Sequence, residues 1–139
     1  MNSPKRILPF TVLASAANTS ADRTSERFLN EAASGLDIRQ VISAYTNPGA
    51  PGAVLTFQIE VQIQLANGDW VRIWQAGSTV AATGTSLYLL SDTGHTNIGA
   101  FTEVEDIPLP LGYWRIVIDV VNGDVNNFAT TLVDAQYVE

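Results

Sequence analysis

A run of alternating polarity constrains this chain more than any other feature. Between residues 53 and 65 every second side chain is apolar, and most of the others are polar. Alternation with a period of two is typical of a β-strand that buries one face and leaves the other in water. The apolar set is Ala53, Leu55, Phe57, Ile59, Val61, Ile63 and Leu65, and the other set is Val54, Thr56, Gln58, Glu60, Gln62 and Gln64. Asn67-Gly68 then predicts a hairpin turn that leads into a returning strand at 70–74.

The rest of the chain has the same character. A strand is predicted over 113–120, followed by a second Asn-Gly turn at 122–123 and a return over 128–138. A polar loop over 15–34 has room for one helical turn near 27–33, closed by Gly35. Further strands are predicted at 7–13, 36–45, 77–84 and 86–90. Together these segments predict an all-β fold, a single antiparallel β-sandwich of about seven or eight strands with jelly-roll or immunoglobulin-like topology.

Length, charge and cysteine content narrow the classes of function. The 139 residues suit one domain, with an extended N-terminal arm or edge strand over 1–18 and the β-sandwich over 19–139. The chain has no cysteine, which excludes disulfides and thiolate chemistry. The N-terminal region lacks an apolar run of signal-peptide or membrane-span length, so we expect synthesis in the cytoplasm and no membrane partner. A net charge of −7 disfavours nucleic acid as a partner.

The length of the first hairpin loop decides which way the tryptophans point. With a two-residue loop, Trp70, Arg72 and Trp74 share the apolar face, and Arg72 is buried. With a three-residue loop and a bulge, Val71 and Ile73 join the apolar face, and Trp70, Arg72 and Trp74 stand outside. We favour the second register, because burial of an unpaired guanidinium costs several kcal/mol.

The sequence offers little catalytic or metal-binding chemistry. His95 is the single histidine, so neither a zinc site nor a nucleophile-base pair can be assembled around it. Asn122, Asp124 and Asn126 have the spacing of calcium ligands, but Val133 stands where an EF-hand needs its closing glutamate. A hydrolase would require a catalytic pair from Glu103, Glu105 and Asp106. We therefore predict no catalytic residue, no metal and no cofactor.

A succession of short motifs covers the chain from residue 19 onward. They are Thr19-Ser20-Ala21-Asp22, Gly35-Leu36-Asp37-Ile38, Leu55-Thr56-Phe57-Gln58-Ile59-Glu60, Asn67-Gly68-Asp69-Trp70, Ala82-Thr83-Gly84-Thr85, Leu109-Pro110-Leu111-Gly112-Tyr113-Trp114-Arg115-Ile116 and Phe128-Ala129-Thr130-Thr131-Leu132. In this order they resemble the head decoration, or auxiliary capsid, proteins of tailed phages, which have a β-sandwich fold. The N-terminal segment is longer and more basic than in that family's pattern.

The resemblance implies a structural role without an active site. Copies, often trimers, would sit on the outside of an icosahedral shell and bridge neighbouring subunits of the major capsid protein. The chain would then be located on the outer surface of a virion. The candidates for capsid contact are Lys5, Arg6, Ile7, Leu8, Phe10, Arg23 and Arg27, and the candidates for an oligomer or ligand surface are Trp70, Arg72, Trp74, Val117 and Val121.

Aromatic residues that could lie at the surface give an alternative function. In a carbohydrate-binding module, or a receptor-binding domain of a phage tail, Trp70, Trp74, Tyr88 or Tyr113 would stack on sugar rings. This alternative predicts a response of tryptophan fluorescence to glycans and has no need of the basic N-terminal segment.

Overall fold

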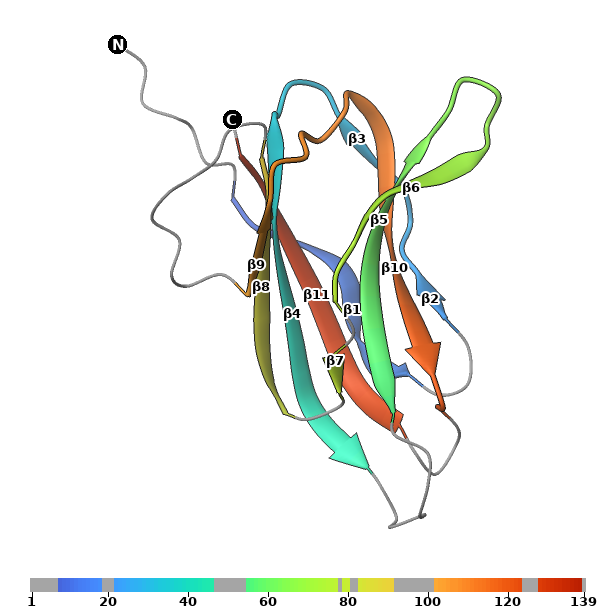
Figure 1. Cartoon of the computed structure of the whole chain (residues 1–139), viewed down its shortest axis with the longest axis vertical. Coiled ribbons are helices and arrows are strands. Elements are labelled where there is room, and N and C mark those ends of the chain that lie inside the picture. Colours follow the sequence, from blue (N-terminus) through green and yellow to red (C-terminus); the bar gives the residue numbers. More distant parts are fainter. Residues whose placement is uncertain are drawn as a thin grey trace.

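The computed structural model describes residues 8–18, 22–46, 55–77, 79–80, 83–91, 102–123 and 128–138, and these form two β-sheets packed face to face (Figure 1). The sheet that we call the β11 sheet contains, in order, β1 (Phe10–Asn18), β11 (Phe128–Val138), β4 (Gly35–Thr46), β8 (Gly84–Leu90) and β9 (Glu103–Glu105). The other, the β10 sheet, contains β2 (Arg23–Thr24), β10 (Gly112–Val121), β5 (Thr56–Gln64) and β6 (Trp70–Gln75), with β3 (Phe28–Asn30) also on β10 and β7 (Thr79–Val80) also on β5. The predicted all-β sandwich is confirmed.

The strand order identifies the sandwich as a jelly roll. β2 and β3 pair with successive parts of β10, and β6 and β7 pair with successive parts of β5, so each couple acts as one interrupted strand. With each couple counted as one strand and β9 set apart as an added edge strand, the eleven strands of the described residues reduce to eight. The first of them pairs with the last, β2/β3 with β10, β4 with β8, and β5 with β6, all antiparallel. This nested pairing is the jelly-roll arrangement.

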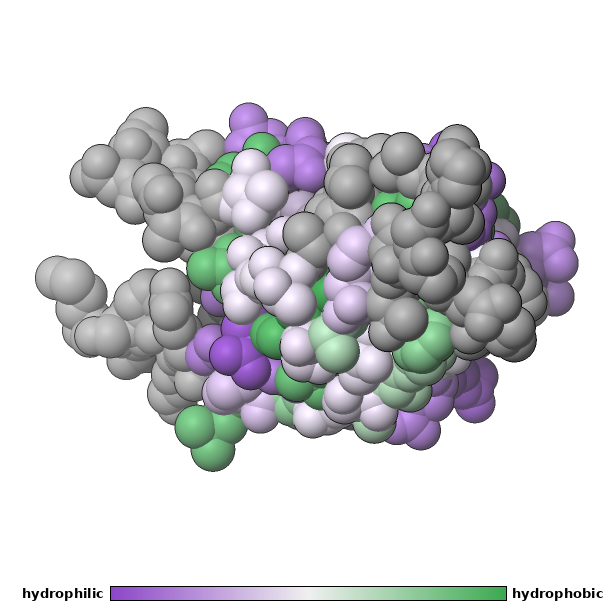
Figure 2. Space-filling view, turned by 90° about the horizontal axis from the view of Figure 1, so that it is seen from below, coloured by the Kyte–Doolittle hydropathy of each residue, from purple (hydrophilic) through white to green (hydrophobic). Residues whose placement is uncertain are grey.

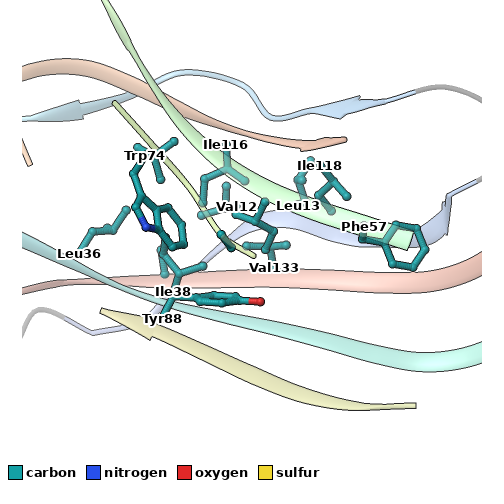
Figure 3. Packing of buried hydrophobic residues seen from close by; sticks show 14 of the residues in the cluster. Val12, Leu13, Leu36, Ile38, Phe57, Trp74, Tyr88, Ile116, Ile118 and Val133 are labelled. Carbon is teal, nitrogen blue, oxygen red and sulfur yellow. The ribbon is translucent and has the colours of Figure 1, made fainter. Parts of the chain in front are cut away.

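The core lies between the two sheets and is filled by the side chains that the alternating pattern predicted to point inward. In β5, Phe57, Ile59 and Val61 are at most 1% exposed. Figure 3 shows ten labelled side chains of the cluster: Val12, Leu13, Leu36, Ile38, Phe57, Trp74, Tyr88, Ile116, Ile118 and Val133. They come from both sheets, so each sheet supplies one wall of the core.

The edge strand β1 is part of this packing. It pairs with β11, and register shifts on both sides of Leu13 mark bulges. The bulged backbone lets two consecutive residues, Val12 and Leu13, both point into the core. The peripheral strand predicted at 7–13 therefore exists at a sheet edge, but it begins at Phe10 and continues to Asn18.

Two local predictions are wrong. The expected helical turn at 27–33 is replaced by β3, because the buried Asn30 side chain donates hydrogen bonds to the carbonyls of Ala33, Leu109 and Pro110 and so fixes a turn without a helix. The segments at 113–120 and 128–138 do not form a hairpin. Both edges of β10 are already paired, with β2/β3 and with β5, so the chain crosses to the other sheet after Asn122, whose φ is 64°.

Candidate interaction surface

The outer face of the β10 sheet brings together charged and aromatic side chains from β10, β5, β6 and the β2/β3 side. We call it the β10 face and define it by the outward residues of β10 and its neighbours. These are Asp22, Thr24, Arg27 and Leu29 on the β2/β3 side, Tyr113, Arg115, Val117, Asp119 and Val121 on β10, Gln58, Glu60, Gln62 and Gln64 on β5, and Trp70, Arg72 and Gln75 on β6.

The β5–β6 hairpin determines which residues reach this face. Its loop has three residues, with Gly68 at a φ of 93° and a hydrogen bond from the amide of Leu65 to the carbonyl of Asp69. The three-residue loop is thus confirmed, although it lies one step earlier than expected, with Gln64 paired to Trp70. Trp70 and Arg72 stand outside, as predicted. The hairpin projects at the upper right of Figure 1.

A bulge then reverses the face of Trp74. The register shifts between Gln62 and Val61, so Arg72 pairs with Gln62 but Trp74 pairs with Val61, and Ile73 is the extra residue. Trp74 therefore points inward, is 5% exposed and packs edge-on against Tyr88 at 5.4 Å between ring centroids. The expectation that Trp74 stands outside is wrong.

Two arginines lie over aromatic rings at the end of the face nearest this hairpin. The guanidinium carbon of Arg115 lies 4.2 Å from the centre of the Trp70 ring, and that of Arg27 lies 4.0 Å from the centre of the Tyr113 ring. The Nε of Arg115 also donates to Oε1 of Gln62 at 2.7 Å. A cation over the face of an aromatic ring is attracted by the negative charge density of that face, and Arg27 also donates from Nη1 to Oε1 of Gln64 at 3.2 Å.

Carboxylates gather further along the same face. Asp119 accepts a hydrogen bond from Nε2 of Gln75 at 3.0 Å and lies beside Glu60, which is 7% exposed. Burial, the charge of Glu60 and a hydrogen bond with Glu60, and then the charge of Asp22, raise the pKa of Asp119 from 3.8 to about 6. Glu60 in turn accepts from Gln62 and lies 3.7 Å from Arg72.

Arg23, a predicted capsid-contact residue, is used inside the molecule. From β2 its Nη1 donates to the carbonyl and the hydroxyl of Thr131 at 3.1 and 3.0 Å, and to the carbonyl of Ala16 at 3.3 Å. Its Nη2 donates to the carbonyl of Ala14 at 2.6 Å. Burial lowers the pKa of this guanidinium. Arg23 thus links the β10 sheet to β1 and β11 of the other sheet through side-chain hydrogen bonds.

The other predicted contact residues lie in different surroundings. Leu8 is 83% exposed, whereas Phe10 packs among Phe28, Trp114 and Tyr137 with ring centroids 5.3 to 6.2 Å apart. Lys5, Arg6 and Ile7 lie outside the described residues. Of the two outward valines predicted to serve an oligomer surface, Val121 is 49% exposed but Val117 only 6%.

The described residues bring no catalytic or metal-binding group together. Within them, no three His, Cys, Asp or Glu side chains are close enough to hold a metal ion, and no helix is long and apolar enough to cross a membrane. Glu103 accepts a hydrogen bond from the amide of Gly77 at 2.9 Å, and Asp106 lies exposed beyond the end of β9. His95, Asp124 and Asn126 lie outside the described part of the chain. A hollow of about 210 Å³ between Leu29–Ala33 and Tyr137 contains one acid, Glu31.

Sequence reasoning missed Arg115, Asp119 and Asp22 as members of a surface. The signal was present for the first two, because alternation along 113–121 puts Tyr113, Arg115, Val117, Asp119 and Val121 on one face. Asp22 joins them only through the pairing of β2 with β10, which no local pattern reveals.

Comparisons with known proteins show the fold and no family. No protein-family model matches the chain, and no curated protein matches its sequence. A chain in the structure of infectious bursal disease virus, Gx strain, matches over 99% of this chain with a TM-score of 0.55 and 11% sequence identity. Our chain spans 33% of the length of that chain. At this identity the likeness establishes a shared fold, so this chain has a jelly-roll architecture that also occurs in a virus structure.

Proposed function

We propose that this protein is a structural component of a virion that attaches to the outer surface of a phage capsid and bridges subunits of the major capsid protein. The observation that carries the proposal is the likeness of the whole jelly roll to a chain of a virus structure. Jelly rolls are common in viral capsids. The succession of decoration-protein motifs supports the finer assignment to a phage shell, made in the host cytoplasm.

The surroundings of the candidate contact residues support a choice among them. Phe10 is packed in the aromatic cluster and Arg23 is held by backbone carbonyls, so both serve the fold. Arg27 lies on the β10 face, stacked on Tyr113. Leu8 is 83% exposed, and it follows directly on Lys5, Arg6 and Ile7 in the sequence. We propose that the segment ending at Leu8 binds the shell, with several copies adding their modest affinities.

The glycan-binding alternative has lost part of its basis. Trp74 and Tyr88 are 5% and 1% exposed, and one face of Trp70 is covered by Arg115. Tyr113, at 37% exposed, is likewise stacked by Arg27. Stacking on a sugar needs an open ring face. Glycan binding is therefore kept only as the alternative to be tested if the chain does not bind capsids.

The test is co-sedimentation with capsids assembled without this protein. The full chain is compared with a chain that begins at Pro9, which lacks the proposed contact segment but keeps Phe10 in its cluster. We expect saturable binding by the full chain and none by the shortened one. Binding by both would retain decoration and move the contact to the sandwich, whereas binding by neither would refute the proposal and favour a glycan screen with Trp70→Ala as control.

A further inference from the structure

The outward side chains of β10 form a pattern that is its own electrostatic complement. In order they are Tyr113, Arg115, Val117, Asp119 and Val121, which read apolar, cation, apolar, anion, apolar. Reading the row backward exchanges the cation with the anion and leaves the apolar positions unchanged. A second copy laid face to face with its β10 antiparallel, centred on Val117, would place each Arg115 against an Asp119.

The residues beside β10 follow the same rule. The register of β3 and β2 places Arg27 next to the level of Arg115, and Asp22 next to the level of Asp119. Both lie on the same side of β10. The two-fold axis would lie between the facing β10 sheets of the two copies and run across their strands. Such an axis places the β2/β3 side of one copy over the β2/β3 side of the other and reverses the strand direction, so Arg27 of one copy would meet Asp22 of the other.

Among the described residues these charges form no ion pair within a single copy, although Arg27 donates to Gln64 and Asp22 accepts from the amide of Val120. Among the described residues the ion pairs are Arg39 with Asp134 and Arg72 with Glu60, so Arg115 and Asp119 belong to neither. The carboxylate of Asp119 lies among other carboxylates, and its raised pKa of about 6 reflects negative surroundings as well as burial. A guanidinium from a second copy would relieve this repulsion.

Apolar contacts and the centre of the face fit the same arrangement. Val121 and Tyr113, 49% and 37% exposed, would meet each other across the axis, and Leu29, 44% exposed, flanks Tyr113. At the centre the two copies of Glu60 would approach each other, but each is already bound within its own sheet by Gln62 and Arg72. We propose that two copies of this chain associate face to face through the β10 face, about a two-fold axis near Val117.

The test exploits the reciprocity of the contact and needs no capsid, so its outcome is independent of shell attachment. Sedimentation equilibrium of the purified chain at low salt should show a monomer–dimer equilibrium that weakens as salt rises. Arg115→Glu alone and Asp119→Arg alone should each raise the dimer Kd by at least about tenfold, because each converts two attractive pairs into repulsive ones. An equimolar mixture of the two variants should recover the wild-type Kd, as should the double variant.

Matched controls reverse the same charges on the opposite side of the molecule. Arg39→Glu and Asp134→Arg lie on the outer face of the β11 sheet and should leave the Kd unchanged. Circular dichroism establishes that each variant is folded. If Arg115→Glu does not fold because it loses its contact with Trp70, the same charge-reversal test is made with Arg27→Glu and Asp22→Arg, at the edge of the β10 face. A monomeric or trimeric wild type, single variants with unchanged Kd, or a mixture that fails to recover would each overturn the proposal.

Discussion

Arg23 illustrates how one side chain closes the sandwich. It bridges the β10 sheet to β1 and β11 through four hydrogen bonds, and one of its partners, Thr131, is fully buried. Arg23→Ala would leave these acceptors without the charged donor, so we expect the free energy of unfolding to fall by about 1.5–3 kcal/mol. Urea denaturation at neutral pH measures the change.

The matched control is Arg39→Ala on the outer face of β4. Arg39 makes a 2.7 Å ion pair with Asp134, but its side chain is 52% exposed. Exposed ion pairs stabilise by about 1 kcal/mol or less. If the two variants lose equal free energy of unfolding, the role assigned to Arg23 in joining the sheets is contradicted.

Asp119 gives the stability of the monomer a pH dependence. Burial and the neighbouring Glu60 raise its pKa from 3.8 to about 6, so between these values the folded state holds a proton that the unfolded state releases. The folded state is therefore favoured by this group below about pH 4, and the advantage is lost as pH rises through 6. Asp119→Asn should match the wild type near pH 4 and be more stable than it at pH 7.5, in urea titrations at concentrations too low for pairing.

The cause of the shift is tested by removing the second carboxylate. In a Glu60→Gln background the pKa of Asp119 should move back toward 3.8, and the gain from Asp119→Asn at pH 7.5 should shrink. A gain of the same size in both backgrounds would show that Glu60 does not raise the pKa of Asp119, which would leave burial and the charge of Asp22 as its causes.

At the scale of the element, the bulge in β6 assigns opposite roles to two tryptophans. Trp74 is 5% exposed and lies in the core, whereas Trp70 lies on the outer face beneath Arg115. Trp74→Ala should lower the free energy of unfolding by about 3–5 kcal/mol, as for other buried aromatic truncations. Trp70→Ala should cost about 1 kcal/mol, the range of a single exposed cation–π contact. Chemical denaturation measures the free energy of unfolding of both variants. Similar decreases would contradict the position of the bulge that turns Trp74 inward and leaves Trp70 outside.

The same hairpin shows what a sequence can predict. The apolar face of β5 was predictable because alternation depends only on the pleat, and Asn67-Gly68 marked the turn because few residues adopt a positive φ. The bulge at Ile73 left no such signal, since the inward position of Trp74 depends on the space opposite Tyr88 in the other sheet. The false hairpin at 122–123 has a similar origin, because the partners of β10 come from residues 23–30 and 56–63.

At the scale of the molecule, the candidate surface was predictable in part. The predicted register puts Trp70 and Arg72 on the outer face, where the structure has them. Alternation along 113–121 also predicts that Arg115 and Asp119 point outward. The roles of Arg23 and Phe10 were not predictable, because both depend on the nested pairing that brings β1 beside β11 and β2 beside β10. A jelly roll forms its contacts between segments far apart in sequence, so surfaces that span several strands are the last property a local pattern reveals.

This nested pairing predicts that the fold depends on its first strand. β1 buries Val12 and Leu13, pairs along β11 and supplies the carbonyls of Ala14 and Ala16 to Arg23. A chain that begins at Thr19 would expose these apolar contacts and leave β11 as an unpaired edge, a loss comparable with the whole stability of a small domain, about 5–15 kcal/mol.

We expect the chain that begins at Thr19 to show no cooperative thermal transition by circular dichroism, whereas a chain beginning at Pro9 keeps the midpoint of the full protein. A peptide of residues 9–18 added to the Thr19 chain should restore the transition, because β1 acts through strand pairing and not through its covalent link. Equal midpoints for the Thr19 and Pro9 chains would instead show that β1 is an appended arm, and the shell-binding segment would then extend to Asn18.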